Sequence, residues 1–155
     1  MTKTLYTIDS LSMTKNTLSA RFWLIILIVA GFAWFGFRLM YGSIVVPPIF
    51  DIFTFVLFAP VAEELFFRGV IQDAIFIKVQ QKSFGITFDS LLGLSVANLL
   101  TSIFFSLLHI PFWGVPHSLL VFFPSLAFGF LYDKSGRLLY PIILHAIYNL
   151  NTFIV

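Results

Sequence analysis

Long apolar runs separated by short breaks containing Gly or Pro dominate this chain. A helix needs roughly 20 apolar residues to span a bilayer, and about five runs approach that length. They cover residues 22–41, 48–77, 91–110, 118–132 and 138–155. The sequence therefore predicts an all-α fold, a polytopic transmembrane helical bundle with about five spans.

The breaks between these runs fall at residues 43–48, 78–85, 111–116 and 133–137. The fourth run is short, and Pro124 and Gly129 inside it predict a tilt or a kink. Residues 1–21 are expected to form a cytoplasmic N-terminal segment. Residues 22–155 then form one transmembrane domain, because the first run lacks the cleavage pattern of a signal peptide.

Basic residues predict how the helices are oriented, because positive charge is retained on the cytoplasmic side. With five spans, one side of the membrane receives Lys3, Lys15, Arg21, Lys78, Lys82, Lys134 and Arg137. The opposite side has Arg38 near the end of the first run. This distribution predicts a cytoplasmic N-terminus in a bacterial cytoplasmic membrane, with the C-terminus outside.

The composition agrees with a membrane protein. Hydrophobic residues make up 59% of the chain, charged residues only 10%, and the mean hydropathy is +1.00. Soluble domains carry about 25% charged residues. The net charge of +2 gives no reason to expect nucleic-acid binding, and the absence of cysteine excludes disulfides, thiolate metal sites and a cysteine nucleophile.

Three charged residues, Glu63, Glu64 and Arg68, lie inside the second run. A charge at mid-membrane costs roughly 3 kcal/mol, so such residues face the bundle interior and mark function. Glu64 and Arg68 are one helical turn apart and are expected to pair, whereas Glu63 points about 100° away. Glu63 is therefore the carboxylate left for chemistry, and the alternative is a buried ion cluster that only joins helices.

Polar residues also recur on single faces of the third and fifth runs. The stripe in the third run consists of Ser95, Asn98, Ser102, Ser106 and His109. In the fifth run, His145 and Asn149 are one turn apart. Each set alone fits a helix-packing seam or a hydrogen bond between helices, but together with the glutamates they predict one shared polar cavity. His117 is expected in a loop near the start of a helix, with a solvated or capping role.

A carboxylate and an imidazole on one water make a general-base arrangement, and a His and an Asn on another helix are suitable oxyanion donors. These residues predict amide hydrolysis without a covalent nucleophile. Two alternatives stay open: Ser102 or Ser106 as nucleophile, and a zinc site of Glu63, His109 and His145 with a bound water.

Three motifs carry a resemblance to a known family. "EELFFRG" fits EExxxR, "FSLLH" with Phe105 and His109 fits FxxxH, and "HAIYN" fits HxxxN, all within residues 60–151. In this order they resemble the CPBP intramembrane proteases, which include type II CAAX prenyl endopeptidases and bacteriocin-processing, Abi-like immunity proteins. The resemblance implies that Glu63 and His109 act on water, His145 and Asn149 are oxyanion donors, and Glu64 with Arg68 is a supporting ion pair.

The resemblance further implies a membrane-associated protein or peptide as substrate, with no cofactor expected and zinc as the alternative. The substrate-binding helices of larger family members are expected to be either missing or supplied by a second copy of the chain or a helper membrane protein. The competing functions are a non-catalytic scaffold or immunity protein and, less favoured, an ion or proton relay. The relay is disfavoured because the chain has no internal repeat.

Straight helices raise a geometric difficulty for the shared cavity. His145 would lie about 10 Å, and His109 about 27 Å, from the cytoplasmic ends of their spans. The two histidines therefore reach one site only if the third run starts well outside the membrane or the fifth is shifted or tilted.

Overall fold

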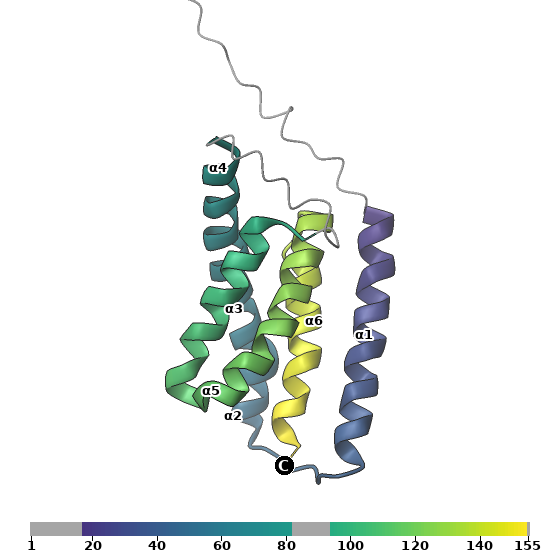
Figure 1. The fold of residues 1–155 in the computed structure, drawn as a ribbon. Helices are drawn as coiled ribbons and strands as arrows, with labels where there is room; N and C mark the ends of the chain where they lie inside the picture. The colour runs from purple at the N-terminus through teal and green to yellow at the C-terminus, as the bar shows by residue number, and fades with distance from the viewer. Residues whose placement is uncertain (1–16, 82–93, 155) are drawn as a thin grey trace, which may run out of the picture.

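The computed structural model describes residues 17–81 and 94–154, and nearly all of them are helical (Figure 1). The helical segments are α1 (Thr17–Leu39), α2 (Ile49–Ile52), η2 (Phe53–Phe58), α3 (Ala59–Phe66), η3 (Phe67–Gln72), α4 (Asp73–Gln81), α5 (Val96–Ser135), α6 (Leu139–Asn149) and η5 (Leu150–Phe153). The described residues contain one isolated β-bridge, between Ile44 and Ile154. The predicted all-α fold is confirmed, while most of segment 1–21 and part of the break at 78–85 lie outside the described residues.

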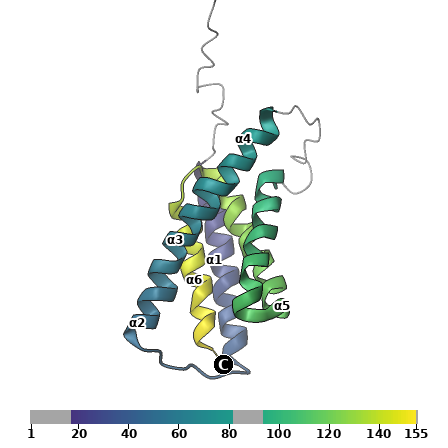
Figure 2. The same cartoon turned by 90° about the vertical axis from the view of Figure 1, so that its left-hand side faces the viewer.

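The segments from α2 to α4 form one continuous helix that crosses the whole bundle (Figure 2). The residues at the junctions, such as Phe53 (φ −58°, ψ −44°) and Asp73 (φ −63°, ψ −43°), keep helical backbone angles. Two turns, η2 and η3, are π-helical, with amides bonded five residues back, as from Ala59 N–H to the Thr54 carbonyl. This helix corresponds to the predicted run 48–77.

The predicted third and fourth runs form the two arms of α5, which folds back on itself (Figure 1). Gly114, with φ 76° and ψ 169°, is the non-helical residue at the fold. Asn98 Nδ2 donates to the Leu126 carbonyl at 3.0 Å, which joins the two arms. The expected break at 111–116 was too wide, because Pro116 fits the first turn of the second arm. His117 lies in α5 itself and not in a loop, but it is close to the start of the second arm, as expected.

Gly129 allows the second arm to approach its neighbours closely. A Cβ at this position would lie 2.0 Å from Asn98 Oδ1 and 2.9 Å from Gln72 Oε1. Only a residue without a side chain permits this contact. The crossing brings both arms of α5 against η3, which carries Arg68.

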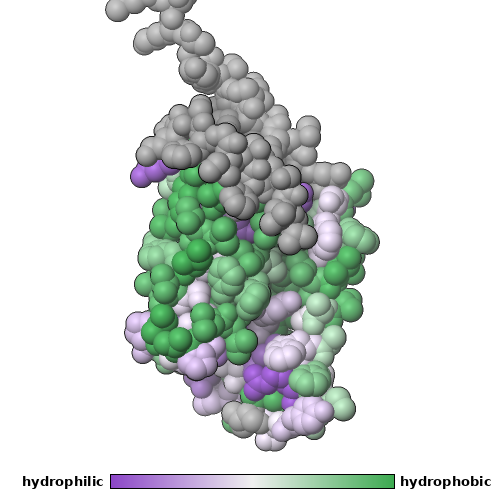
Figure 3. Space-filling model, in the orientation of Figure 1, coloured by the Kyte–Doolittle hydropathy of each residue, from purple (hydrophilic) through white to green (hydrophobic). Residues whose placement is uncertain are grey.

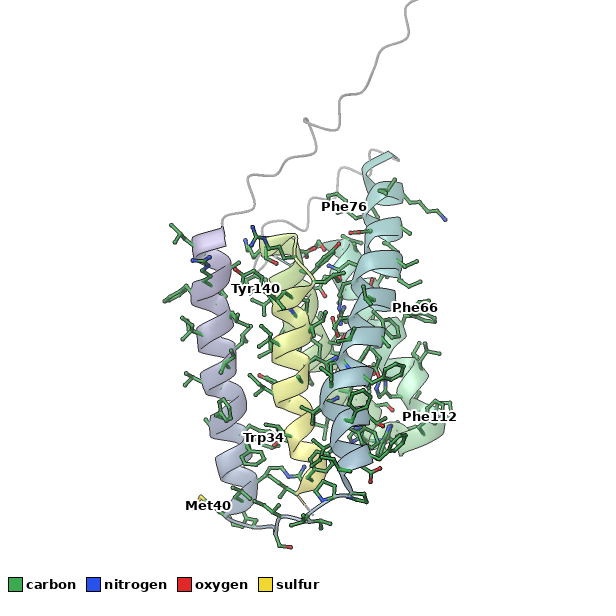
Figure 4. The ribbon with its side chains drawn as sticks, turned by 180° about the vertical axis from the view of Figure 1, so that it is seen from behind. Trp34, Met40, Phe66, Phe76, Phe112 and Tyr140 are labelled. Atoms are coloured by element: carbon green, nitrogen blue, oxygen red, sulfur yellow. The ribbon has the colours of Figure 1, made fainter. Side chains whose placement is uncertain are left out.

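The apolar residues divide between a small core and a large exposed surface. Phe128, Leu131, Tyr140 and Leu144 form the core, against which α1 packs. Much of the face in Figure 3 is hydrophobic, and Phe66 and Phe112, labelled in Figure 4, are 47% and 81% exposed. Such a surface suits lipid rather than water. Two helical segments, Leu18–Leu39 and Val96–Ser135, are long and apolar enough to cross a membrane, so the count of about five spans stays a prediction.

The first residues of α1 lie at the same end of the bundle as the last residues of α4 and α5 (Figure 1). Arg21, Lys78 and Lys134 belong to these three helix ends. Arg38 is in the last turn of α1, next to Met40 at the other end of the bundle (Figure 4). The basic residues therefore segregate along the bundle, and the direction in which it crosses the membrane stays a prediction.

The fold at Gly114 gives the first test. Its backbone angles belong to a region that only glycine occupies readily, so Gly114→Ala is expected to cost about 1–3 kcal/mol. Thermal unfolding in detergent should show a lower midpoint for this variant. Gly36→Ala is the matched control, because Gly36 is helical and a Cβ there meets nothing within 4 Å. Equal midpoints for the two variants would contradict the described turn.

Candidate active site

The carboxylate of Glu64 lies at the centre of the polar residues. It is completely buried, and its two oxygens accept hydrogen bonds from different helical segments. Arg68 Nε donates to Oε2 at 2.8 Å, and His145 Nδ1 donates to Oε1 at 2.9 Å. The predicted pairing of Glu64 with Arg68 is therefore present, and Glu64 also joins this helix to α6.

Arg68 is also completely buried, and further polar groups bind its remaining N–H groups. Nη2 donates to Ser125 Oγ at 2.8 Å, and Nη1 approaches Gln72 Oε1 at 3.4 Å. Gln72 Nε2 in turn donates to Asp133 Oδ1 at 2.8 Å. A buried arginine is tolerable only with such partners. The four-residue spacing that pairs Glu64 with Arg68 also places Gln72 on the same face, but the spacing gives no signal for Ser125 and Asp133.

Glu63 has a different environment from its neighbour. About a third of its side chain (32%) is exposed. Its Oε2 atom, however, is buried and accepts no hydrogen bond from the described residues. His145 Nε2 lies 3.8 Å from this oxygen, which is within reach of a charge interaction but too far for a hydrogen bond. Glu63 is thus the carboxylate with an unused buried acceptor.

The imidazole of His145 is held in a fixed orientation. The ring of Phe128 stacks on it, with centroids 4.7 Å apart and planes at 18°, and Phe105 contacts it edge-on at 5.9 Å. Because Nδ1 donates to the Glu64 carboxylate, Nε2 faces Glu63. His145 therefore connects the two glutamates.

His109 approaches the site from α5, one turn beyond Phe105. Its Nδ1 lies 2.8 Å from the Phe105 carbonyl, which can only accept, so Nδ1 carries the hydrogen and Nε2 is left as an acceptor. The ring also packs on Phe105 at 4.5 Å, and the same Phe105 ring contacts His145 at 5.9 Å.

The predicted difference in depth between the two histidines is reduced because α5 begins only at Val96. The Ser95 side chain accepts from Asn98 N and thus caps this helix instead of extending the polar stripe. The Phe105 ring spans the distance that remains, since it contacts the rings of both His109 and His145. Both histidines thereby come to the same site.

Asn149 lies one turn beyond His145 on α6, and its Nδ2 donates to the Phe55 carbonyl at 2.8 Å. The structure thus places the predicted donor against the same helix as the glutamates, although its hydrogen bond is to the backbone of η2.

The serines of the third run belong to a packing seam. Ser106 Oγ donates to the Ser118 carbonyl, and Ser102 Oγ donates to Asn98 Oδ1 at 3.1 Å. These contacts hold α5 together and commit both hydroxyl hydrogens, which disfavours a serine nucleophile. Among residues 17–81 and 94–154, no group of three or more His, Asp or Glu side chains is placed to hold a metal ion, and the zinc alternative stays a prediction.

Fold and site together define an integral membrane protein, a helical bundle with a buried centre of glutamate, arginine and histidine. The family model for type II CAAX prenyl endopeptidases, Rce1-like, matches residues 45–151, which is more than half of the chain. The chain belongs to this family of proteases, and the resemblance indicated by the three motifs is confirmed. No curated protein and no solved structure matches the chain.

The Glu64–Arg68 pair gives the second test. Arg68→Gln leaves a buried carboxylate without its cation and should destabilise the protein by about 3–5 kcal/mol. The double variant Glu64→Gln with Arg68→Gln removes both charges and should recover part of that loss. Thermal unfolding in detergent measures both effects. A single variant that unfolds at the wild-type temperature would contradict the described ion pair.

Proposed function

We propose that this protein is an intramembrane endopeptidase that hydrolyses a peptide bond of a membrane-associated protein or peptide, using a water activated by Glu63 and His109. The observation that carries the proposal is the buried, unbonded Oε2 of Glu63, which lies 3.8 Å from His145 Nε2, with His109 joined to the same site through the Phe105 ring. Membership of a protease family supports the reaction class.

In the proposed reaction, Glu63 accepts a proton from water while the water oxygen attacks the scissile carbonyl carbon. His109 Nε2, the acceptor left by the bond of Nδ1 to Phe105, orients that water. The tetrahedral intermediate then collapses, and the proton held by Glu63 passes to the departing amine. Each step uses a carboxylate or an imidazole in an ordinary general acid–base role.

The charge that develops on the carbonyl oxygen needs donors from another helix. We assign this role to His145 Nε2, when it carries a hydrogen, and to the second hydrogen of Asn149 Nδ2. The first hydrogen of that amide is donated to Phe55. In this scheme Glu64 and Arg68 act through His145, whose ring they hold in place.

In this proposal no step passes through a metal, which agrees with the lack of a group of three or more His, Asp or Glu side chains placed to hold one among the described residues. The scaffold or immunity alternative predicts no role for an unbonded carboxylate. A partly exposed Glu63 with a buried free oxygen favours the enzyme.

The third test uses protein reconstituted in lipid vesicles with a farnesylated CAAX peptide and the same peptide without the lipid. Glu63→Gln and His109→Ala should each slow cleavage, followed by mass spectrometry, at least about 100-fold, because a positioned general base contributes that much. Asp51→Asn is the matched control, since Asp51 lies on α2, outside the site, and belongs to the same continuous helix.

The unfolding temperatures of all three variants should stay close to that of the wild type. Cleavage that persists in Glu63→Gln but fails in Glu64→Gln would show that Glu64, and not Glu63, is the catalytic carboxylate. A stably folded wild type that cleaves neither peptide would favour the scaffold.

A further inference from the structure

Pro60 interrupts the hydrogen bonding of the helix just before the glutamates. In the π-helical turn η2, the N–H of Ala59 donates to the Thr54 carbonyl, five residues back. The next amide in the same register would reach the Phe55 carbonyl. Residue 60 is a proline, however, and has no N–H to donate.

Asn149 of α6 supplies the missing donor. Its Nδ2 lies 2.8 Å from the Phe55 carbonyl oxygen. A backbone carbonyl without a partner is costly where lipid replaces water. The side chain of a distant helix therefore takes the place of the amide hydrogen that Pro60 lacks.

This bond acts together with another between α6 and the helix carrying the glutamates. His145 binds Glu64, and Asn149, one turn further along α6, binds Phe55. Two hydrogen bonds one helical turn apart fix both the distance between the two helices and their relative position along the helix axis. Pro60 is fully buried and only three residues before Glu63, so a change in this turn would also turn both glutamates.

We propose that Asn149 is a positioning residue, which completes the π-helical turn opened by Pro60 and thereby holds Glu63 and Glu64 in their places around His145. The bond itself does not depend on the reaction, whereas its importance for catalysis rests on the proposed function. An oxyanion donor alone would have no reason to depend on Pro60.

The fourth test is a double-mutant cycle between Asn149→Ala and Pro60→Ala, followed by thermal unfolding in detergent. Asn149→Ala should lower the unfolding midpoint by about 4 °C, because it removes the donor from a buried carbonyl. In the Pro60→Ala background, where residue 60 regains an N–H, the same change should have less than about half that effect. Additive effects of the two changes would overturn the proposal.

Asn151→Ala is the matched control. Asn151 Nδ2 donates to the Tyr148 carbonyl at 3.0 Å, within the same stretch of chain. The decrease in unfolding midpoint caused by Asn151→Ala should therefore be the same with proline or alanine at position 60. Equal coupling of Pro60 to Asn149 and to Asn151 would show that Pro60→Ala destabilises the helix generally. It would contradict a specific link between Pro60 and the Asn149–Phe55 bond.

A second readout follows the position of His145 directly. The chain has three histidines, so ¹⁵N-histidine NMR with His109 and His117 substituted in turn assigns the Nδ1–H resonance bonded to Glu64. Asn149→Leu keeps most of the side-chain volume without the donor and should move this resonance, and Pro60→Ala should return it toward its original position.

If Pro60→Ala does not fold, Asn149→Leu alone decides the question, and an unmoved His145 resonance contradicts the proposal. Neither readout uses a substrate. If the protein proves not to be a protease, the result of the double-mutant cycle still stands. If the cycle shows no coupling between Asn149 and Pro60, peptide cleavage still tests the protease assignment.

Discussion

The site depends on the two hydrogen bonds of the buried Glu64 carboxylate. One oxygen accepts from Arg68 on the same helix, and the other accepts from His145 on α6. Because neither lipid nor a packed core offers replacements, a buried charge of this kind persists only with its partners in place. These two hydrogen bonds therefore determine where α6 lies. The buried charge of Arg68 also requires the further polar groups that surround it.

The same arrangement separates the roles of two adjacent glutamates. Both oxygens of Glu64 are used in bonds that hold the structure together. Glu63 instead keeps a buried oxygen without a hydrogen bond, 3.8 Å from His145 Nε2. Two carboxylates with unlike surroundings are typical of sites in which one holds the geometry and the other does chemistry. The aromatic rings of Phe105 and Phe128 complete the site by fixing His145 and bringing His109 beside it.

Patterns within one helix and the gathering of polar residues from several helices were readable from the sequence, whereas the individual hydrogen bonds between helices were not. The four-residue spacing predicted the Glu64–Arg68 pair, and the apolar runs predicted the helices. The one-residue fold at Gly114 was missed because the two prolines around it indicated a longer loop. Ser125 and the Phe55 carbonyl escaped prediction because their partners, Arg68 and Asn149, are 57 and 94 residues away in the chain.

The most direct measurement is an experimental structure of the protein in lipid nanodiscs at a resolution that reveals ordered water. The proposed mechanism predicts a water within about 3 Å of Glu63 Oε2, on the side that faces His109 and His145. A Glu63 carboxylate turned onto Arg68, or a His109 ring facing the lipid, would contradict it.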